Sequence, residues 1–219
     1  DCRAIMGRSA ALDDLLLGAP ACPPEVLATA VRAPGGERRR ELVLSSALPD
    51  DVVEELVHSQ ESGRRVAVAE RSDLSEAQAL VLASDPDLQV QLQLARGTGL
   101  AGAVVGALAR SGFSGVRAEV ARRELAPELQ RLLAGDAEVV VRTQLAQRTD
   151  LHHEVLDQLL GDDALEVRLR TIQANAGRLP GSFLEGLMVG RCAPPFWDQA
   201  QLPPQALLSQ WRRPPVTNT

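Results

Sequence analysis

The chain has 219 residues, a hydrophobic fraction of 45% and a net charge of −6, which exclude a disordered polypeptide and disfavour a dedicated nucleic-acid binder. No apolar run approaches the roughly 18 residues that a membrane-spanning helix needs, so no membrane partner is expected. All 23 basic residues are arginine, a bias that the codon usage of a GC-rich bacterial genome explains. The three cysteines are too few and too scattered for a disulfide framework or a zinc site, which indicates a cytoplasmic protein.

Residues 1–21 read as an N-terminal partial repeat or cap, in which ALDDLLLG (11–18) is the second helix of a preceding unit. From residue 22 a phrase recurs that predicts one helix per copy. Each copy opens with Leu or Cys, often has Pro soon after, and has apolar residues four and eight positions later, which is the spacing of one helix face. The copies begin at Cys22, Leu48, Leu74, Leu100, Leu125, Leu151 and Leu179.

Successive copies begin roughly 26 residues apart, a nearly constant period that indicates a repeat architecture. Prolines such as Pro49 and Pro127 are expected in the first helical turn, where a missing N–H costs nothing. Asp73 and Asp150 directly precede the phrase and are expected to cap the helix N-terminus. Gln78 interrupts the apolar stripe, and its neighbour Ala77 is expected to face inward instead.

A second helical segment precedes each phrase, as in 63–73, 90–99, 115–124 and 139–150. It carries a small residue where neighbouring helices would approach closely: Ala69, Ala95, Ala121, Ala146 and Ala174. The residue four positions earlier is usually arginine: Arg39, Arg65, Gln91 (the exception), Arg117, Arg142 and Arg170. We expect these arginines to pair with an acidic turn residue of their own or of a neighbouring unit, and the acidic turn residues are Asp85, Asp87, Asp136, Asp162 and Asp163.

A two-helix unit this short cannot bury its own apolar face, so neighbouring units must stack to form a core. The sequence therefore predicts an all-α fold, an α-solenoid of about six two-helix repeats of roughly 26 residues over 22–188. Residues 189–219, where the phrase stops, read as a Pro-rich C-terminal cap and tail.

The phrases LP-x-x-VL-x-x-L and D…VR-x-x-LA resemble the bacterial variant leucine-rich repeats and, more loosely, HEAT-like α-helical repeats over residues 22–188. The resemblance implies a right-handed superhelix. Some variant leucine-rich proteins carry an iron–sulfur cluster ahead of the repeats, which takes about four cysteine ligands. Only Cys2 and Cys22 lie in that region here, so no cofactor is expected.

A second group of arginines lies at the ends of the second helices: Arg71, Arg96, Arg122, Arg123 and Arg148. Cations there complement the helix dipole and cap the last carbonyl groups. If the repeats are in register, the same side chains form one edge that could bind a partner. Trp197, beyond the repeats, either seals the last unit or anchors a partner.

Catalytic and metal sites are not expected. His152 and His153 are adjacent on a predicted helix and would point about 100° apart, whereas helical metal ligands prefer a spacing of four residues. Cys22 occupies a core position of the phrase and is expected to act as a small hydrophobic residue.

These features favour a non-enzymatic scaffold or adaptor that presents an extended surface to a protein or peptide. One alternative is a nucleic-acid-binding repeat protein resembling the HEAT-like alkylpurine DNA glycosylases, but Trp197 and Asp198 lie outside the repeats and the pI near 5.2 disfavours it. Another is an inhibitor whose acidic face blocks a basic partner.

Overall fold

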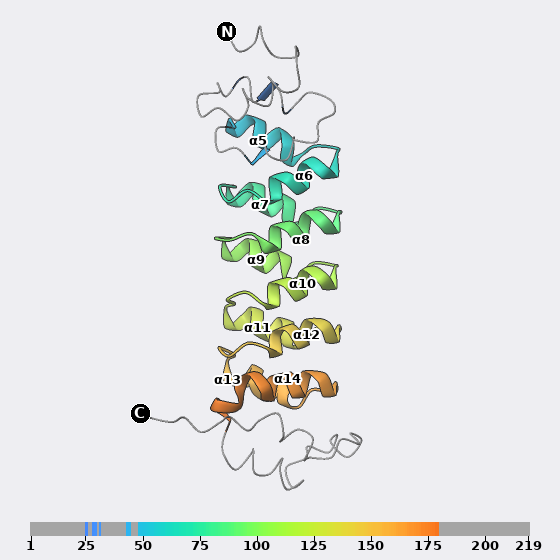
Figure 1. Ribbon diagram of the computed structural model, residues 1–219, viewed down its shortest axis with the longest axis vertical. Coiled ribbons are helices and arrows are strands. Elements are labelled where there is room, and N and C mark those ends of the chain that lie inside the picture. The colour runs from blue at the N-terminus through green and yellow to red at the C-terminus, as the bar shows by residue number, and fades with distance from the viewer. Residues whose placement is uncertain (1–24, 26–27, 30, 32–42, 45–47, 180–219) are drawn as a thin grey trace, which may run out of the picture. The chain divides into compact units, whose positions relative to one another are not determined.

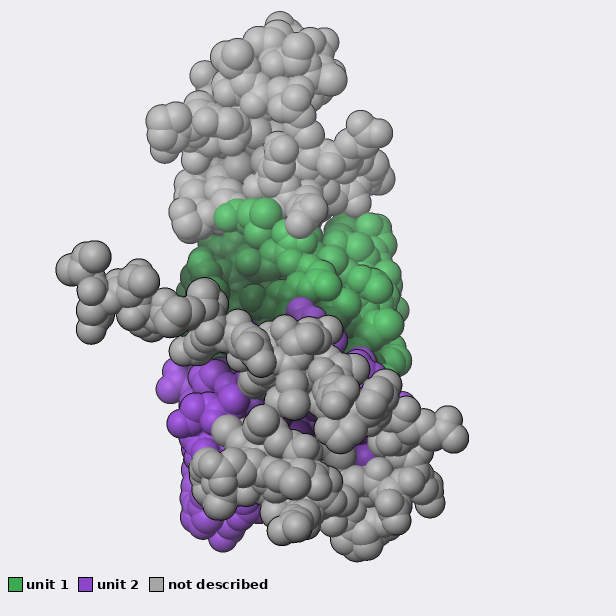
Figure 2. All heavy atoms as spheres, turned by 60° about the horizontal axis from the view of Figure 1, so that its bottom comes forward, with its two compact units in different colours: residues 1–120 green, residues 121–219 purple. Residues whose placement is uncertain are grey.

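The computed structural model describes residues 25, 28–29, 31, 43–44 and 48–179, and every regular element in this part of the chain is helical (Figure 1). The predicted partial repeat at 1–21, the cap and tail at 189–219, and Trp197 lie outside the described residues. The chain divides into two compact units, unit 1 (Asp1–Val120) and unit 2 (Ala121–Thr219), coloured separately in Figure 2. The described helices are all too short or too polar to cross a lipid bilayer.

In unit 1 the described helices are α5 (Asp50–Val57), α6 (Ser62–Ala69), α7 (Glu76–Ala83), α8 (Leu88–Arg96), α9 (Gly102–Leu108) and α10 (Ser114–Ala121), the last ending one residue beyond the unit boundary. Each helix packs on its neighbour in sequence or on the helix two places further on: α5 on α6 and α7, α6 on α8, and α7 on α9. Figure 1 shows the result within unit 1, where α5, α7 and α9 lie on one side and α6 and α8 on the other.

In unit 2 the described helices are α11 (Pro127–Ala134), α12 (Val139–Ala146), α13 (His153–Leu160), α14 (Leu165–Asn175) and the short 3₁₀ helix η1 (Ala176–Arg178). The packing follows the same rule, with α11 on α12 and α13, and α12 and α13 on α14. Each phrase from Leu48 to Leu151 is therefore followed by a first and a second helix, so the expected alternation is confirmed within each unit.

The odd-numbered helices α5 to α13 begin two residues after the leucine that opens each phrase. Leu48, Leu125 and Leu151 therefore lie in the turns and are buried, while the corresponding Leu74 and Leu100 are half-buried. The residues at the eighth position of the phrase form the centre of the apolar face and are at most 2% exposed: Leu56, Leu82, Leu108, Leu133 and Leu159.

The starts of these helices correct two of the predictions. Asp73 and Asp150 do not cap helices, because the N-cap residues are Ser75 and His152. Ser75 accepts a hydrogen bond from the N–H of Gln78, whose side chain accepts one from the N–H of Ser75. Gln78 is thus a capping residue, and the expectation that Ala77 faces inward is wrong because Ala77 is exposed.

The prolines also have defined places at these helix starts. Pro127 is the first residue of α11, as predicted, whereas Pro49 is the N-cap of α5 rather than part of its first turn. Neither position needs a backbone N–H for the helix ladder, so both prolines fix the helix start without the loss of a hydrogen bond.

The small-residue position of the second helices is confirmed at Ala69, Ala95, Ala121 and Ala146, none of which is more than 1% exposed. The prediction fails in α14, where Ile172 rather than Ala174 lies one repeat period after Ala146. The arginine four residues before Ile172 is Arg168, which is 3% exposed, whereas Arg170 is exposed. Arg168 therefore takes the place that the sequence pattern assigned to Arg170.

Candidate partner-binding surface

The arginines of the second helices act as buried connectors within each unit. In unit 1 the guanidinium of Arg65 (α6) donates from Nε to Asp85 Oδ2 at 2.6 Å and from Nη2 to Asp85 Oδ1 at 3.1 Å. Asp85 lies 20 residues further on, in the turn before α8. This hydrogen bond with Asp85 raises the pKa of Arg65 above its ordinary value, so the guanidinium stays charged.

Unit 2 repeats this arrangement at the same spacing. Arg142 (α12) donates from Nε to Asp162 Oδ2 at 2.7 Å and from Nη2 to Asp162 Oδ1 at 3.1 Å, and also from Nη2 to Asp163 at 2.9 Å. The side chains of Arg142 and Asp162 are 10% and 6% exposed. The predicted pairing with acidic turn residues is thus confirmed for Arg65 and Arg142, whereas Arg170 donates to Gln173 and Arg39 lies outside the described residues. We call each such link, from a second helix to the turn before the next second helix, a rung.

Gln91, the exception in the arginine series, forms a neutral rung. Its Oε1 accepts a hydrogen bond from Ser111 Oγ at 2.5 Å, and Ser111 is again 20 residues further on. Gln91 and Ser111 are 6% and 8% exposed. The amide and the hydroxyl therefore replace the guanidinium and the carboxylate at both ends of the same link.

The residue at the position of Asp85, Ser111 and Asp162 in each described turn has two further roles. Its side-chain oxygen accepts from the backbone N–H two residues later, over distances of 2.8–3.2 Å, for Ser59, Asp85, Ser111, Asp136 and Asp162. Its carbonyl oxygen accepts from the helix side chain six residues later, over 2.6–2.9 Å, for Arg65, Gln91, Arg117, Arg142 and Arg168. The same bonds recur in both units, so each turn is joined to the helix that follows it in the same way. The exposed side chains of successive second helices within a unit therefore lie at equivalent positions.

The second group of arginines divides into two registers rather than one exposed row. Arg71 and Arg148 lie two residues after the buried alanine, and their side chains are 4% and 10% exposed. Arg71 donates to both carboxylate oxygens of Asp73 and to the carbonyl oxygen of Val43. Arg148 donates to Asp150. We call this Arg-x-Asp pair an elbow, and it removes Arg71 from the predicted binding edge.

The elbow in unit 2 shifts the pKa of its aspartate. The hydrogen bond from Arg148 lowers the pKa of the Asp150 carboxyl below its ordinary value, against the opposing effect of partial burial. Arg178 adds to this lowering and also donates to the carbonyl oxygens of Thr149 and Leu151 at 2.8 and 2.7 Å. The turn 148–151 is therefore held from two sides.

Arg96 and Arg122 occupy the other register, one residue after the buried alanine, and both are exposed. Arg122 donates from Nε to Gln144 Oε1 at 2.9 Å. Arg123 is half-buried and is followed directly by Glu124, because the turn here is one residue shorter than the turns that contain the elbows. Of the five predicted arginines, Arg96 and Arg122 therefore present exposed side chains.

A hollow of about 390 Å³ lies on unit 2 beside Arg122. It is lined by Arg122, Gln144, Gln147, Arg148, Thr149 and Asp150. Gln147 is exposed and donates to Thr143 O at 3.4 Å and to Gln144 Oε1 at 3.5 Å. The structure thus brings together Arg122 and Arg148 from the predicted set and adds two glutamines that sequence reasoning did not select.

Two polar features near the start of α13 complete this part of unit 2. The rings of His152 and His153 lie 4.3 Å apart between centroids, and among the described residues no group of three or more His, Cys, Asp or Glu side chains could hold a metal ion. Gln130 is 4% exposed, donates to Leu125 O at 3.2 Å and accepts from the N–H of His152 at 2.9 Å. Gln130 therefore ties α11 to the start of α13.

The chain matches no protein-family profile, no curated protein and no solved structure.

Proposed function

We propose that the protein is a non-enzymatic interaction scaffold, built as a right-handed α-solenoid of about six two-helix repeats over residues 22–188. The observation that carries the proposal is the constancy of the turn bonds. Turn residues such as Asp85 and Asp162 accept from the N–H of the N-cap residue of the next helix, and the turn carbonyls of Ser59 and Asp136 accept from the arginine six residues later, in unit 1 as in unit 2. Such bonds hold each turn and the second helix after it in the same arrangement from repeat to repeat, which regular stacking of repeats needs.

The exposed residues of the second helices support a role in binding extended chains. Within unit 2, α12 packs on α14; Gln147 is exposed at the C-terminal end of α12, and Arg170 and Gln173 are exposed on α14. Arg170 donates to Gln173 Oε1 at 3.4 Å within α14, whereas Arg122 donates to Gln144 Oε1 across 22 residues. Exposed amide and guanidinium groups of this kind suit a polypeptide partner, whose own polar groups recur along its length.

The solenoid part of the proposal is tested by small-angle X-ray scattering of the full chain. A compact globule of 219 residues has a radius of gyration of about 17 Å. Stacked repeats give a larger value, because successive helices pack about 8–10 Å apart along one direction. A measured value at or below that of the globule would overturn the solenoid.

The scaffold part is tested by affinity capture with the full chain in extracts of the native host, followed by calorimetric titration with each purified candidate. A saturable complex with one protein, at a fixed stoichiometry and without chemical change in that protein, is the expected result. Turnover of a defined substrate, abolished by a point variant that stays folded, would overturn the proposal. Tight binding of DNA whose affinity falls steeply with salt would favour the nucleic-acid alternative.

A further inference from the structure

The hollow on unit 2 has the size and the polar groups of a subsite for one or two peptide residues. Its volume of about 390 Å³ is near the lower end of the range of about 300–1,000 Å³ for ligand pockets. All six lining residues are polar or charged. A large apolar cofactor would find no apolar side chain there, whereas a charged side chain with its adjoining peptide groups would find hydrogen-bonding partners.

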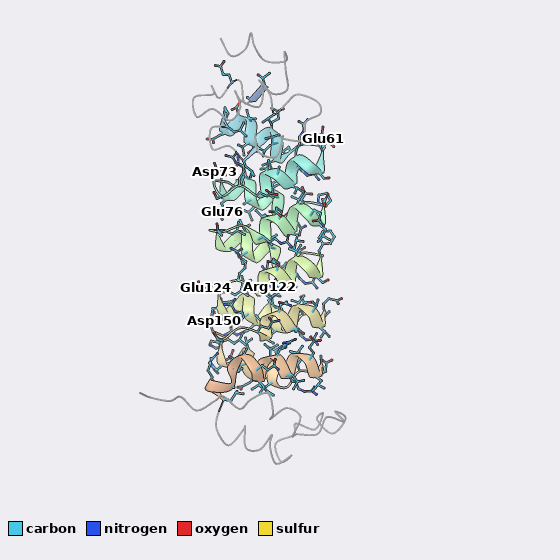
Figure 3. The ribbon with its side chains drawn as sticks, in the orientation of Figure 1. Glu61, Asp73, Glu76, Arg122, Glu124 and Asp150 are labelled. Atoms are coloured by element: carbon cyan, nitrogen blue, oxygen red, sulfur yellow. The ribbon has the colours of Figure 1, made fainter. Side chains whose placement is uncertain are left out.

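The charge of this hollow is opposite in sign to that of the chain. Arg122 and Arg148 contribute two positive charges, Asp150 contributes one negative charge, and the whole chain carries −6. Asp150 is already engaged by Arg148, and Arg178 lies against the same turn. Glu124, labelled with Arg122 and Asp150 in Figure 3, is not among the lining residues. The hollow is therefore a locally cationic place on an acidic protein.

Arg122 is held in position before any ligand arrives. Gln144 Oε1 accepts from Arg122 Nε at 2.9 Å and from Gln147 Nε2 at 3.5 Å, so one amide oxygen orients both side chains. A planar guanidinium whose orientation is fixed matches a carboxylate through paired N–H···O bonds, and the entropy lost on binding is reduced.

We propose that this hollow binds an aspartate or glutamate side chain within an extended acidic segment of a protein partner. The inference rests on the proposed scaffold function and names its site and the chemistry of its partner. Arg122 receives the carboxylate, while Gln147 bonds the neighbouring peptide groups, since a side-chain amide both donates and accepts. The segment continues toward α14, where Arg170 and Gln173 offer the same pair of groups.

Unit 1 supplies a matched control at the same register. Arg96, like Arg122, is exposed and follows the buried alanine of its helix by one residue. The residue that corresponds to Gln144 in unit 1 is Glu119, a carboxylate, 23 positions after Arg96 where Gln144 is 22 after Arg122. A carboxylate at the position of the orienting amide would repel an acidic ligand, so Arg96 is expected not to bind the same segment.

The test uses fluorescence anisotropy of the full chain with labelled ten-residue peptides that alternate serine with glutamate, glutamine or lysine. The glutamate peptide is expected to bind about 5–10-fold more tightly than the glutamine peptide, the gain of about 1–1.4 kcal/mol typical of one charged hydrogen-bonded contact. Arg122→Ala is expected to remove this preference, Arg122→Lys to keep part of it, and Arg96→Ala to leave it within about 2-fold of the wild-type value.

Three outcomes would overturn the inference: equal binding of the glutamate and glutamine peptides, an equal loss in Arg96→Ala and Arg122→Ala, or tighter binding of a single-stranded ten-nucleotide DNA than of the glutamate peptide. A natural partner that binds wild type and Arg122→Ala equally well would exclude this site and leave the scaffold function standing. If the protein proves to be an enzyme but still prefers the glutamate peptide, the scaffold function would be excluded and the peptide site would stand.

Discussion

In unit 1 the rung between Gln91 and Ser111 is neutral, whereas in unit 2 the rung between Arg142 and Asp162 is a buried ion pair. Both rungs span the same separation in sequence, and both helix side chains also bond the carbonyl oxygen six residues earlier. The two ends of the link differ together, which has a physical reason: a buried carboxylate opposite a neutral amide would lack a compensating charge. The two rungs therefore have the same geometry, and the residue types at their two ends match: arginine with aspartate, or glutamine with serine.

The largest expected effect comes from breaking the charged rung of unit 2. Arg142→Ala removes the countercharge of the buried Asp162 carboxylate, which keeps only the N–H of Ala164, and the donor to the Asp136 carbonyl, and should lower the free energy of unfolding by about 3–5 kcal/mol. Urea unfolding followed by circular dichroism measures this loss.

The control for that experiment is the exposed pair of Arg131 and Glu154, whose side chains are 45% and 57% exposed. Arg131→Ala should cost much less than Arg142→Ala, because solvent screens the pair. Equal losses in the two variants would mean that burial of the rung contributes nothing.

Breaking the neutral rung of unit 1 should cost less. Gln91→Ala removes the bonds to Ser111 and to the Asp85 carbonyl but strands no charge, so a loss of about 1–3 kcal/mol is expected. The same urea titration measures it. A loss of stability as large as that of Arg142→Ala would show that the charge of the residues in a rung does not determine how much the rung stabilises the chain.

Exchanging the chemistry of the neutral rung sharpens the comparison. Gln91→Arg alone places a cation opposite Ser111, and Ser111→Asp alone places a carboxylate opposite Gln91, so both should destabilise the chain. The double variant recreates the pair found at Arg65 and Asp85, and Asp can also accept from the N–H of Phe113 as Asp85 does from Asp87. A double-mutant cycle should give a favourable coupling of about 1–3 kcal/mol. If the stability losses of the two single variants simply add in the double variant, the residues at the two ends of the rung do not depend on each other.

The smallest expected effect concerns the exposed Asp150 carboxylate of the elbow in unit 2 and depends on pH. Because the folded pKa of Asp150 lies below the unfolded value, its contribution is complete above about pH 4 and is lost as pH falls through the lower folded pKa. Asp150→Asn should therefore lower the stability by less than about 1 kcal/mol at pH 7. The difference from wild type should vanish in strong acid, as thermal unfolding at a series of pH values would measure. A difference that grows on acidification would contradict the assigned direction.

The sequence pattern was sufficient for the helices and for the buried positions that recur once in each repeat. It also predicted the pairing of Arg65 and Arg142 with acidic turns, because both charges appear at a constant spacing. It failed in α14, where Arg168 and Arg170 are both present and alanine spacing favoured the wrong one. The spacing of six residues from Asp162 identifies Arg168, as it identifies Arg142 from Asp136.

The candidate surface was less accessible to sequence reasoning. Arg71 and Arg148 were assigned to an exposed edge, yet each has an aspartate two residues later that draws the guanidinium into the turn. An Asp directly before the phrase also reads as an N-cap, so the local pattern could not separate the two roles. The hollow depends on Gln144 and Gln147, whose significance comes from side chains that meet in space rather than from any periodicity.

The rungs also carry information about order along the chain. The segment 136–161 begins with Asp136 and contains Arg142, so a tandem duplicate of it would present a carboxylate to its own guanidinium. The segment 85–110 begins with Asp85 but contains Gln91, so a duplicate would place a buried carboxylate opposite an amide. Recombination can therefore copy some segments freely, while others are tolerated only beside a neighbour with the complementary group.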